Sequence, residues 1–174
     1  MGPPLSNISP QPNIVFLFPD QMRSDFLSCY GADFIETPNI DSLARNGTLY
    51  RNAYSASPIC VPARTALLTG MNAVRNGVTD NDHSIRGDYN DVGIRTWPQL
   101  LADKGYYTAA IGKMHFYPWD SRHGFQYRVI AEDKRWLHIR DDYYHYLHNR
   151  GLRKFHGREH DEYVQNKGAI INRL

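Results

Sequence analysis

Five consecutive residues, Cys60-Val61-Pro62-Ala63-Arg64, combine groups that could carry out chemistry on an anion. Pro62 suits the first turn of a helix, where the N–H that it lacks is not needed. Cys60 would then lie at a helix N-terminus, whose unpaired N–H groups and dipole favour anions. Arg64, one turn further along, could hold an oxyanion through two hydrogen bonds. The spacing predicts a nucleophile beside an anion site, but a buried structural cysteine followed by an arginine in a surface ion pair would give the same pattern.

A candidate metal ligand follows an apolar run near the start of the chain. Residues 13–18 form this run, which is typical of a strand buried on both faces of a parallel sheet, and Pro19 and then Asp20 follow it. Open α/β sheets bind their ligands at the carboxyl ends of the strands, and hard cations are bound by oxygen ligands. Asp20 is therefore a candidate ligand, with turn capping as the alternative.

A lysine and a histidine follow a second apolar segment, residues 106–111. Lys113 and His115 are two positions apart, so their side chains would share one face if the segment were extended. Together they could bind an anion and protonate a leaving oxygen. Taken alone, such a pair is more often a surface lysine and a hydrogen-bonded histidine.

Capped helices and short strands would have to position these groups. Residues 63–69 are predicted to be a helix ended by Gly70, with residues 66–68 partly buried. A helix is also predicted from the N-cap Thr37 to Gly47, with Ile40, Leu43 and Ala44 as its buried stripe. Further helices are expected over 96–105 and 140–150, strands over 48–54 and 106–111, and a long connection over 71–94. We expect an α/β fold, a mainly parallel sheet flanked by helices.

Composition fits one ordinary globular domain. The chain has 174 residues, 41% of them hydrophobic and 22% charged, and we expect a domain over 13–174 after a disordered segment, residues 1–12. A net charge of +2 and the lack of any basic run argue against nucleic acid as a partner. Two cysteines are too few for a disulfide framework, no Cys-x-x-Cys supports a redox protein, and Cys29 is expected to be a packed thiol.

The N-terminal residues carry no recognisable targeting signal. They have no basic region followed by an apolar core, and the longest apolar run, residues 14–18, is too short to span a membrane. We expect a cytoplasmic protein with no membrane partner, or a periplasmic or secreted one if a signal has been removed.

Residues 57–70 closely resemble the signature of the sulfatase family, in which the cysteine of C-x-P-x-R is oxidised to formylglycine. The resemblance continues through residues 37–41 and through Gly-Tyr-x-Thr-Ala-x-x-Gly-Lys-x-His, which ends at His115. It covers residues 12–125 well and 126–151 loosely. It implies the N-terminal region of an alkaline-phosphatase-like fold, incomplete because family members are generally longer and their later Asp-Asn or Asp-His metal pair cannot be located here.

The resemblance also implies an activity, hydrolysis of small-molecule or saccharide sulfate esters. Formylglycine at Cys60, made by a formylglycine-generating enzyme, would attack sulfur as its hydrate, which Arg64 would stabilise. Lys113 would hold the sulfate, and His115 would assist on the leaving-group side. Asp20, Gln21 and the Cys60-derived oxygen would bind a divalent cation, Ca²⁺, with Mn²⁺ or Mg²⁺ as alternatives.

One departure from the family pattern keeps other functions open. Many sulfatases carry two adjacent aspartates where this chain has Asp20 and Gln21. The glutamine looks like the subset that contains choline sulfatases and phosphonate or phosphate ester hydrolases. The alternatives are therefore a phosphonate or phosphate ester hydrolase with the same nucleophile, and a non-catalytic fragment in which Cys60 stays a thiol.

Overall fold

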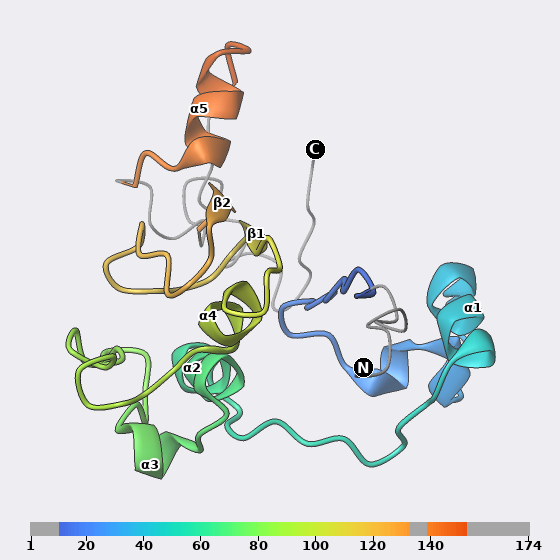
Figure 1. Ribbon diagram of the computed structural model, residues 1–174. Coiled ribbons are helices and arrows are strands. Elements are labelled where there is room, and N and C mark those ends of the chain that lie inside the picture. Colours follow the sequence, from blue (N-terminus) through green and yellow to red (C-terminus); the bar gives the residue numbers. More distant parts are fainter. Residues whose placement is uncertain (1–10, 133–138, 153–174) are drawn as a thin grey trace, which may run out of the picture. The chain divides into compact units, whose positions relative to one another are not determined.

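The computed structural model describes residues 11–132 and 139–152, and the chain divides into two compact units, Met1–Ala53 and Tyr54–Leu174. In the first unit, the described elements are η1 (Ser24–Phe26), η2 (Ser28–Tyr30) and α1 (Pro38–Asn46). In the second unit they are α2 (Cys60–Thr69), α3 (Ala73–Asn76), α4 (Trp97–Ala102), β1 (Ala109–Gly112), β2 (Tyr127–Ile130) and α5 (Asp142–His148) (Figure 1). Most of the segment expected to be disordered, residues 1–10, lies outside the described residues.

Helix α1 has the predicted boundaries but not the predicted buried stripe. Thr37 is its N-cap, Pro38 lies in its first turn, and Gly47 ends it. The Asp41 carboxylate accepts hydrogen bonds from the Cys29 N–H, at 2.9 Å, and from the Thr37 hydroxyl, at 3.0 Å, and so ties α1 to η2. Leu43, predicted to be buried, is 63% exposed, and no residue of α1 is fully buried. Polar contacts near its N-terminus therefore hold this helix more than an apolar face does.

Two strand predictions are wrong. Residues 13–18 and 48–54 are irregular, and the apolar side chains of the first run are exposed, with Val15 at 81%. A strand persists only where a neighbouring strand pairs with its N–H and C=O groups. Among the described residues, neither segment has such a neighbour, because the sheet found there consists of β1 and β2.

The parallel sheet and flanking helices of the predicted α/β class are present in the second unit. Strand β1 pairs with β2 in parallel, Ala109 opposite Tyr127. The predicted strand over 106–111 thus forms slightly later in the sequence, and β2 was not predicted. Just before β1, the Thr108 N–H donates to the Gln126 side chain at 2.9 Å, and the Gln126 N–H donates back to the Thr108 carbonyl at 2.9 Å.

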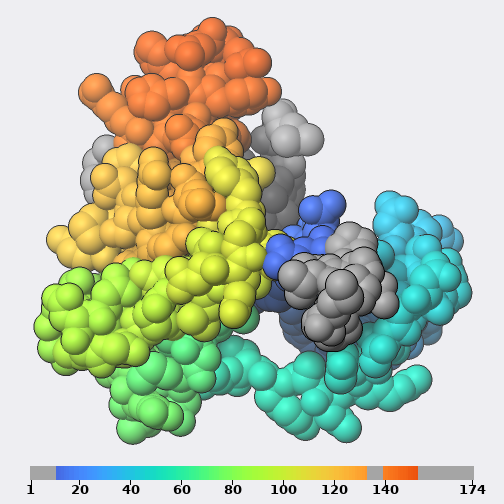
Figure 2. Space-filling model, viewed as in Figure 1, coloured from blue at the N-terminus to red at the C-terminus, as the bar shows by residue number. Residues whose placement is uncertain are grey.

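Helix α2 contributes to two apolar clusters among the described residues of the second unit. The first cluster joins its Val61 to the connection that follows: Val78, Ile85 and Tyr89, with Ile94 against them. The second joins its Leu68 to the region around the sheet: Ala110, Phe116 and Phe125, with Trp97 and Met114 against them. In Figure 2 the green-to-orange residues of this unit accordingly form one continuous body. The prediction that residues 66–68 are partly buried fails only at Leu67, which is 40% exposed.

The loop before β2 is fastened to α4. The predicted cap of α4 is a capping box. The Thr96 side chain accepts a hydrogen bond from the Gln99 backbone N–H, and the Gln99 side chain accepts one from the Thr96 backbone N–H. The Thr96 hydroxyl also donates to the His123 carbonyl at 2.8 Å.

Within the described ranges, no helix is long and apolar enough to cross a membrane.

Candidate active site

Cys60 lies at a helix N-terminus, as predicted, although α2 begins at Cys60 itself rather than at residue 63. Ile59 is the N-cap, and Gly70 ends the helix in the left-handed conformation, φ 68°, with its N–H donating to the Ala66 carbonyl at 2.8 Å. Cys60 is a half-buried free thiol. The fold therefore presents this sulfur at a helix N-terminus, next to a turn that has donors and a dipole favourable to an anion.

The donors at this helix end are partly used by the protein itself. The Val61 N–H donates to the Asn81 side chain at 3.0 Å, and Pro62 has no N–H. Fewer N–H groups thus face an anion than the sequence argument assumed. Asn81 was missed because it lies in the long connection, where nothing in the sequence indicates which helix an asparagine will cap.

Arg64 is buried, with 8% of its surface exposed, so the alternative of a surface ion pair is wrong. Its Nη1 donates to the Lys113 carbonyl oxygen at 2.8 Å. Helix α2 is therefore fastened to the segment that carries the predicted anion-binding lysine. The structure brings these two parts of the predicted site together through one direct contact.

Residues 113–115, referred to below as the bend, do not continue the strand. Strand β1 ends at Gly112, which has φ 104°, and His115 has φ 57°. The argument that the Lys113 and His115 side chains share a face because the chain is extended is therefore wrong. His115 is only 5% exposed, whereas Lys113 is half-buried.

Glu132, which the sequence analysis missed, lies against this bend. Its Oε1 accepts hydrogen bonds from the Met114 N–H at 3.2 Å and the His115 N–H at 3.1 Å, and its Oε2 also accepts from the His115 N–H, at 3.1 Å. Burial raises the pKa of Glu132, while these amides and the charges of Arg128 and Arg64 act in the opposite direction. Glu132 is the second residue after the end of β2, so a correct prediction of that strand would have drawn attention to it.

A buried arginine accompanies Glu132. The Arg128 Nη2 lies 3.8 Å from the Glu132 Oε1, and its guanidinium lies over the Phe116 ring, 5.1 Å from the centroid. Burial lowers the pKa of Arg128, against the attraction of nearby carboxylates. Burial and the Arg128 charge together lower the pKa of His123 to about 4. His123 is therefore neutral at neutral pH, in keeping with a structural loop histidine.

The predicted metal ligands Asp20 and Gln21 belong to the first unit and are exposed. Gln21 has φ 57°, an uncommon backbone conformation for a residue other than glycine. A carboxylate beside an amide suits an oxygen-preferring cation. Over the described ranges, no group of three or more His, Cys, Asp or Glu side chains is placed to hold a metal. These two residues thus fit part of a cation site.

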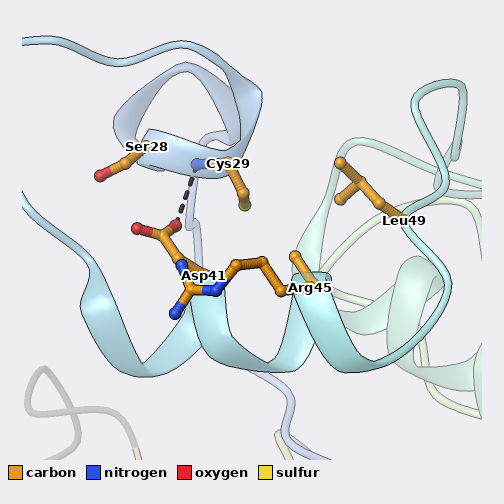
Figure 3. A pocket seen from close by; sticks show the side chains of 6 residues that line it. Ser28, Cys29, Asp41, Arg45 and Leu49 are labelled. Atoms are coloured by element: carbon orange, nitrogen blue, oxygen red, sulfur yellow. Dashed lines mark hydrogen bonds between the residues drawn. The ribbon is translucent and has the colours of Figure 1, made fainter.

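The other cysteine lines a hollow of about 330 Å³ in the first unit (Figure 3). The hollow is lined by Ser28, Cys29, Asp41, Ala44, Arg45 and Leu49. The carboxylate that faces it, Asp41, is already bound to backbone and hydroxyl groups of its own unit. Cys29 is a half-buried free thiol that lines this hollow, and its role as a structural thiol stays a prediction.

Comparison with known proteins bears directly on this chain. The family model described as Sulfatase matches residues 12–167. An N-acetylglucosamine-6-O-sulfatase of Bacteroides thetaiotaomicron is 37% identical over 134 residues, which cover 77% of this chain and 22% of that relative. The chain therefore spans about a fifth of that protein.

Solved structures are similar over a comparable part of the chain. One is a protein bound to its substrate, D-glucosamine-2-N,6-O-disulfate. It has a TM-score of 0.53 and 38% identity, and the match covers 60% of this chain and 20% of that protein's chain. Another is a phosphonate monoester hydrolase of Agrobacterium radiobacter, with a TM-score of 0.57 and 26% identity over 76% of this chain and 27% of the other. Because the family model covers most of its length, this chain belongs to the sulfatase family.

Proposed function

We propose that this chain forms part of a sulfuric ester hydrolase whose nucleophile derives from Cys60. The observation that carries the proposal is the hydrogen bond from the Arg64 side chain to the Lys113 carbonyl. It connects the helix that begins at Cys60 to the segment that holds Lys113 and His115. These three residues, each of which could act on an anionic ester, therefore belong to segments that are in direct contact.

Cys60 would act after oxidation to formylglycine by a formylglycine-generating enzyme. The modified residue supplies an oxygen nucleophile, which makes a covalent route possible and divides one difficult step into two easier ones. Its position at the start of α2, half-buried and unpaired with another cysteine, is compatible with that modification.

Arg64, Lys113 and His115 would act on the charges that develop on the ester and on the attacking oxygen. Arg64, whose side chain is buried, would stabilise the attacking oxygen through its guanidinium group. Lys113, half-buried, would bind the sulfate oxygens, and His115 would hold or donate a proton on the leaving-group side.

Asp20 and Gln21 would supply ligands to a divalent cation, Ca²⁺ in the first place and Mn²⁺ or Mg²⁺ as alternatives. Their carboxylate and amide oxygens are the donor types that such cations prefer. When bound, the cation would polarise the sulfate oxygens.

The substrate class we propose is a sulfated saccharide. Support comes from the N-acetylglucosamine-6-O-sulfatase and from the complex that contains D-glucosamine-2-N,6-O-disulfate. A phosphonate ester is the second candidate, because the chain also resembles a phosphonate monoester hydrolase and carries Gln21 after Asp20.

The test compares rates of hydrolysis on matched aryl sulfate and aryl phosphonate esters, with the full chain as its host makes it. We expect a higher kcat/KM on the sulfate. We also expect Cys60→Ala to lower kcat by at least about 10³-fold, and Arg64→Ala or Lys113→Ala by about 10² to 10³-fold.

Cys29→Ala is the matched control and is expected to keep normal turnover. A Cys60→Ala protein with normal turnover would disprove the proposed nucleophile. A higher kcat/KM on the phosphonate would replace the proposed substrate class with the second candidate.

A further inference from the structure

The backbone at His115 is in a conformation that needs support. Its φ of 57° lies in the left-handed region, which residues other than glycine seldom adopt. Such conformations are energetically costly and persist only where surrounding contacts fix them. Contacts from elsewhere in the fold must therefore hold His115 in this conformation.

Glu132 is the group in contact with the bend. Both of its carboxylate oxygens lie 3.1 Å from the His115 nitrogen, and Oε1 also accepts from the Met114 N–H at 3.2 Å. The Glu132 side chain is fully buried, so water does not compete for these bonds. A charged acceptor that binds two successive N–H groups in a dry environment forms stronger hydrogen bonds than a neutral one.

Glu132 is itself held from the other side. Its backbone N–H donates to the Asp141 Oδ2 at 2.8 Å, and the Asp141 Oδ1 accepts from the Tyr144 N–H, also at 2.8 Å, as the N-cap of α5. Asp141 is buried, at 1% exposed. The end of β2 and the start of α5 therefore form a fixed support for the carboxylate.

The same bend is fastened from α2 by Arg64, whose Nη1 donates to the Lys113 carbonyl at 2.8 Å. Two consecutive peptide groups, Lys113–Met114 and Met114–His115, are thus bound by two buried side chains of opposite charge. Burial raises the pKa of Glu132, while the hydrogen bonds from the Met114 and His115 amides and the charges of Arg128 and Arg64 lower it. The ionised carboxylate is the form that accepts all of these bonds.

We propose that Glu132 is a positioning residue, which fixes the backbone of Met114 and His115 and thereby the side chains of Lys113 and His115. This role rests on the proposed function insofar as those two side chains act on a sulfate ester. Glu132 is not proposed to touch the substrate. Its effect is to hold two reacting groups in one geometry, and misplacing such groups by about 1 Å can cost about a hundredfold in rate.

The test is amide hydrogen exchange at Met114 and His115 in the full chain, with Glu132→Gln as the main variant. The glutamine has one acceptor oxygen, and its NH₂ group faces N–H donors. We expect the two amides to exchange about tenfold faster or more, which corresponds to the loss of one hydrogen bond to a charged group. We expect kcat/KM on an aryl sulfate to fall about tenfold to a hundredfold, mainly through kcat.

Two acid-to-amide variants serve as controls. Glu36→Gln changes an exposed carboxyl in the other unit. Asp142→Asn acts on the junction of β2 and α5, where the Asp142 Oδ2 accepts from the Ile130 N–H, but touches neither amide. Both are expected to leave exchange at Met114 and His115 unchanged. If Glu132→Gln fails to fold, Glu132→Asp keeps the charge on a shorter side chain and is expected to show the same faster exchange.

The outcomes separate this inference from the proposed function. Unchanged amide exchange in Glu132→Gln would overturn the inference, and so would faster exchange with unchanged kcat/KM. If the unaltered chain hydrolyses no sulfate ester, the proposed function fails, and the exchange rates alone decide whether Glu132 fixes the bend.

Discussion

His123 shows how burial sets the charge of a single side chain. Its ring packs against Phe116, with centroids 4.5 Å apart, and against Tyr89, at 5.5 Å. Burial, with the nearby Arg128 charge, lowers its pKa from 6.5 to about 4. Between these two pH values the unfolded chain binds a proton that the folded chain does not. The free energy of unfolding therefore falls as the pH is lowered from about 6.5 to about 4.

The variant His123→Phe tests this. It keeps an aromatic ring against Phe116 and removes the titrating group, so stability should depend less on pH. We expect the loss between pH 6.5 and pH 4, the limits set by the two pKa values, to shrink by about 3 kcal/mol in urea unfolding. His145→Phe, which changes an exposed histidine, should keep the original slope. An unaltered slope in His123→Phe would show that another group causes the pH dependence.

The sequence could predict site residues whose setting is local. Cys60 lies at a helix start because Pro62 and Gly70, close to it in sequence, define that helix. Glu132 and Asn81 could not be identified in this way, because each acts on a segment far from it in sequence. Residue type and spacing predict local elements, while contacts between distant segments depend on packing.

At the level of elements, helices were predicted better than strands. Helices α1, α2 and α4 each carry a proline in the first turn, and α1 and α4 begin after a capping threonine. These signals lie within the helix or next to it. A strand depends on its neighbour, so residues 13–18 and 48–54, which looked like strands, are irregular, and β2 was missed.

The contact between α4 and the loop before β2 can be tested at a glycine. Gly124 has φ 96°, and a Cβ there would lie 2.6 Å from both the Thr96 Oγ1 and the Gln99 Cγ. Gly93 also has a positive φ, 80°, but a Cβ there would meet nothing within 4 Å. Gly93→Ala is expected to cost about 1 to 2 kcal/mol from backbone strain alone.

Gly124→Ala should cost a further 1 to 3 kcal/mol or so, because it also overpacks the contact with α4. Urea unfolding of both variants measures the difference. Equal losses of stability would mean that the loop can move away from α4 without cost, and that the capping box does not need this close approach.

At the level of the whole molecule, the fold class and the family could be predicted from the sequence, but the exposure of the first apolar run could not. The chain belongs to the sulfatase family and spans 22% of the curated relative described above. Its apolar run at residues 14–18 is exposed in the structure. A continuous apolar pattern indicates that a segment can be buried, whereas burial itself requires the partner that covers it.

The most direct test of the central claim is peptide mass spectrometry across Cys60, on protein isolated from its native host. We predict the mass of formylglycine at this position, in which an aldehyde replaces the thiol side chain. Cys29, in the same digest, is the internal control and should remain an unmodified thiol. A Cys60 that is also entirely unmodified would contradict the account, because the chain would then lack the nucleophile on which the proposed hydrolysis depends.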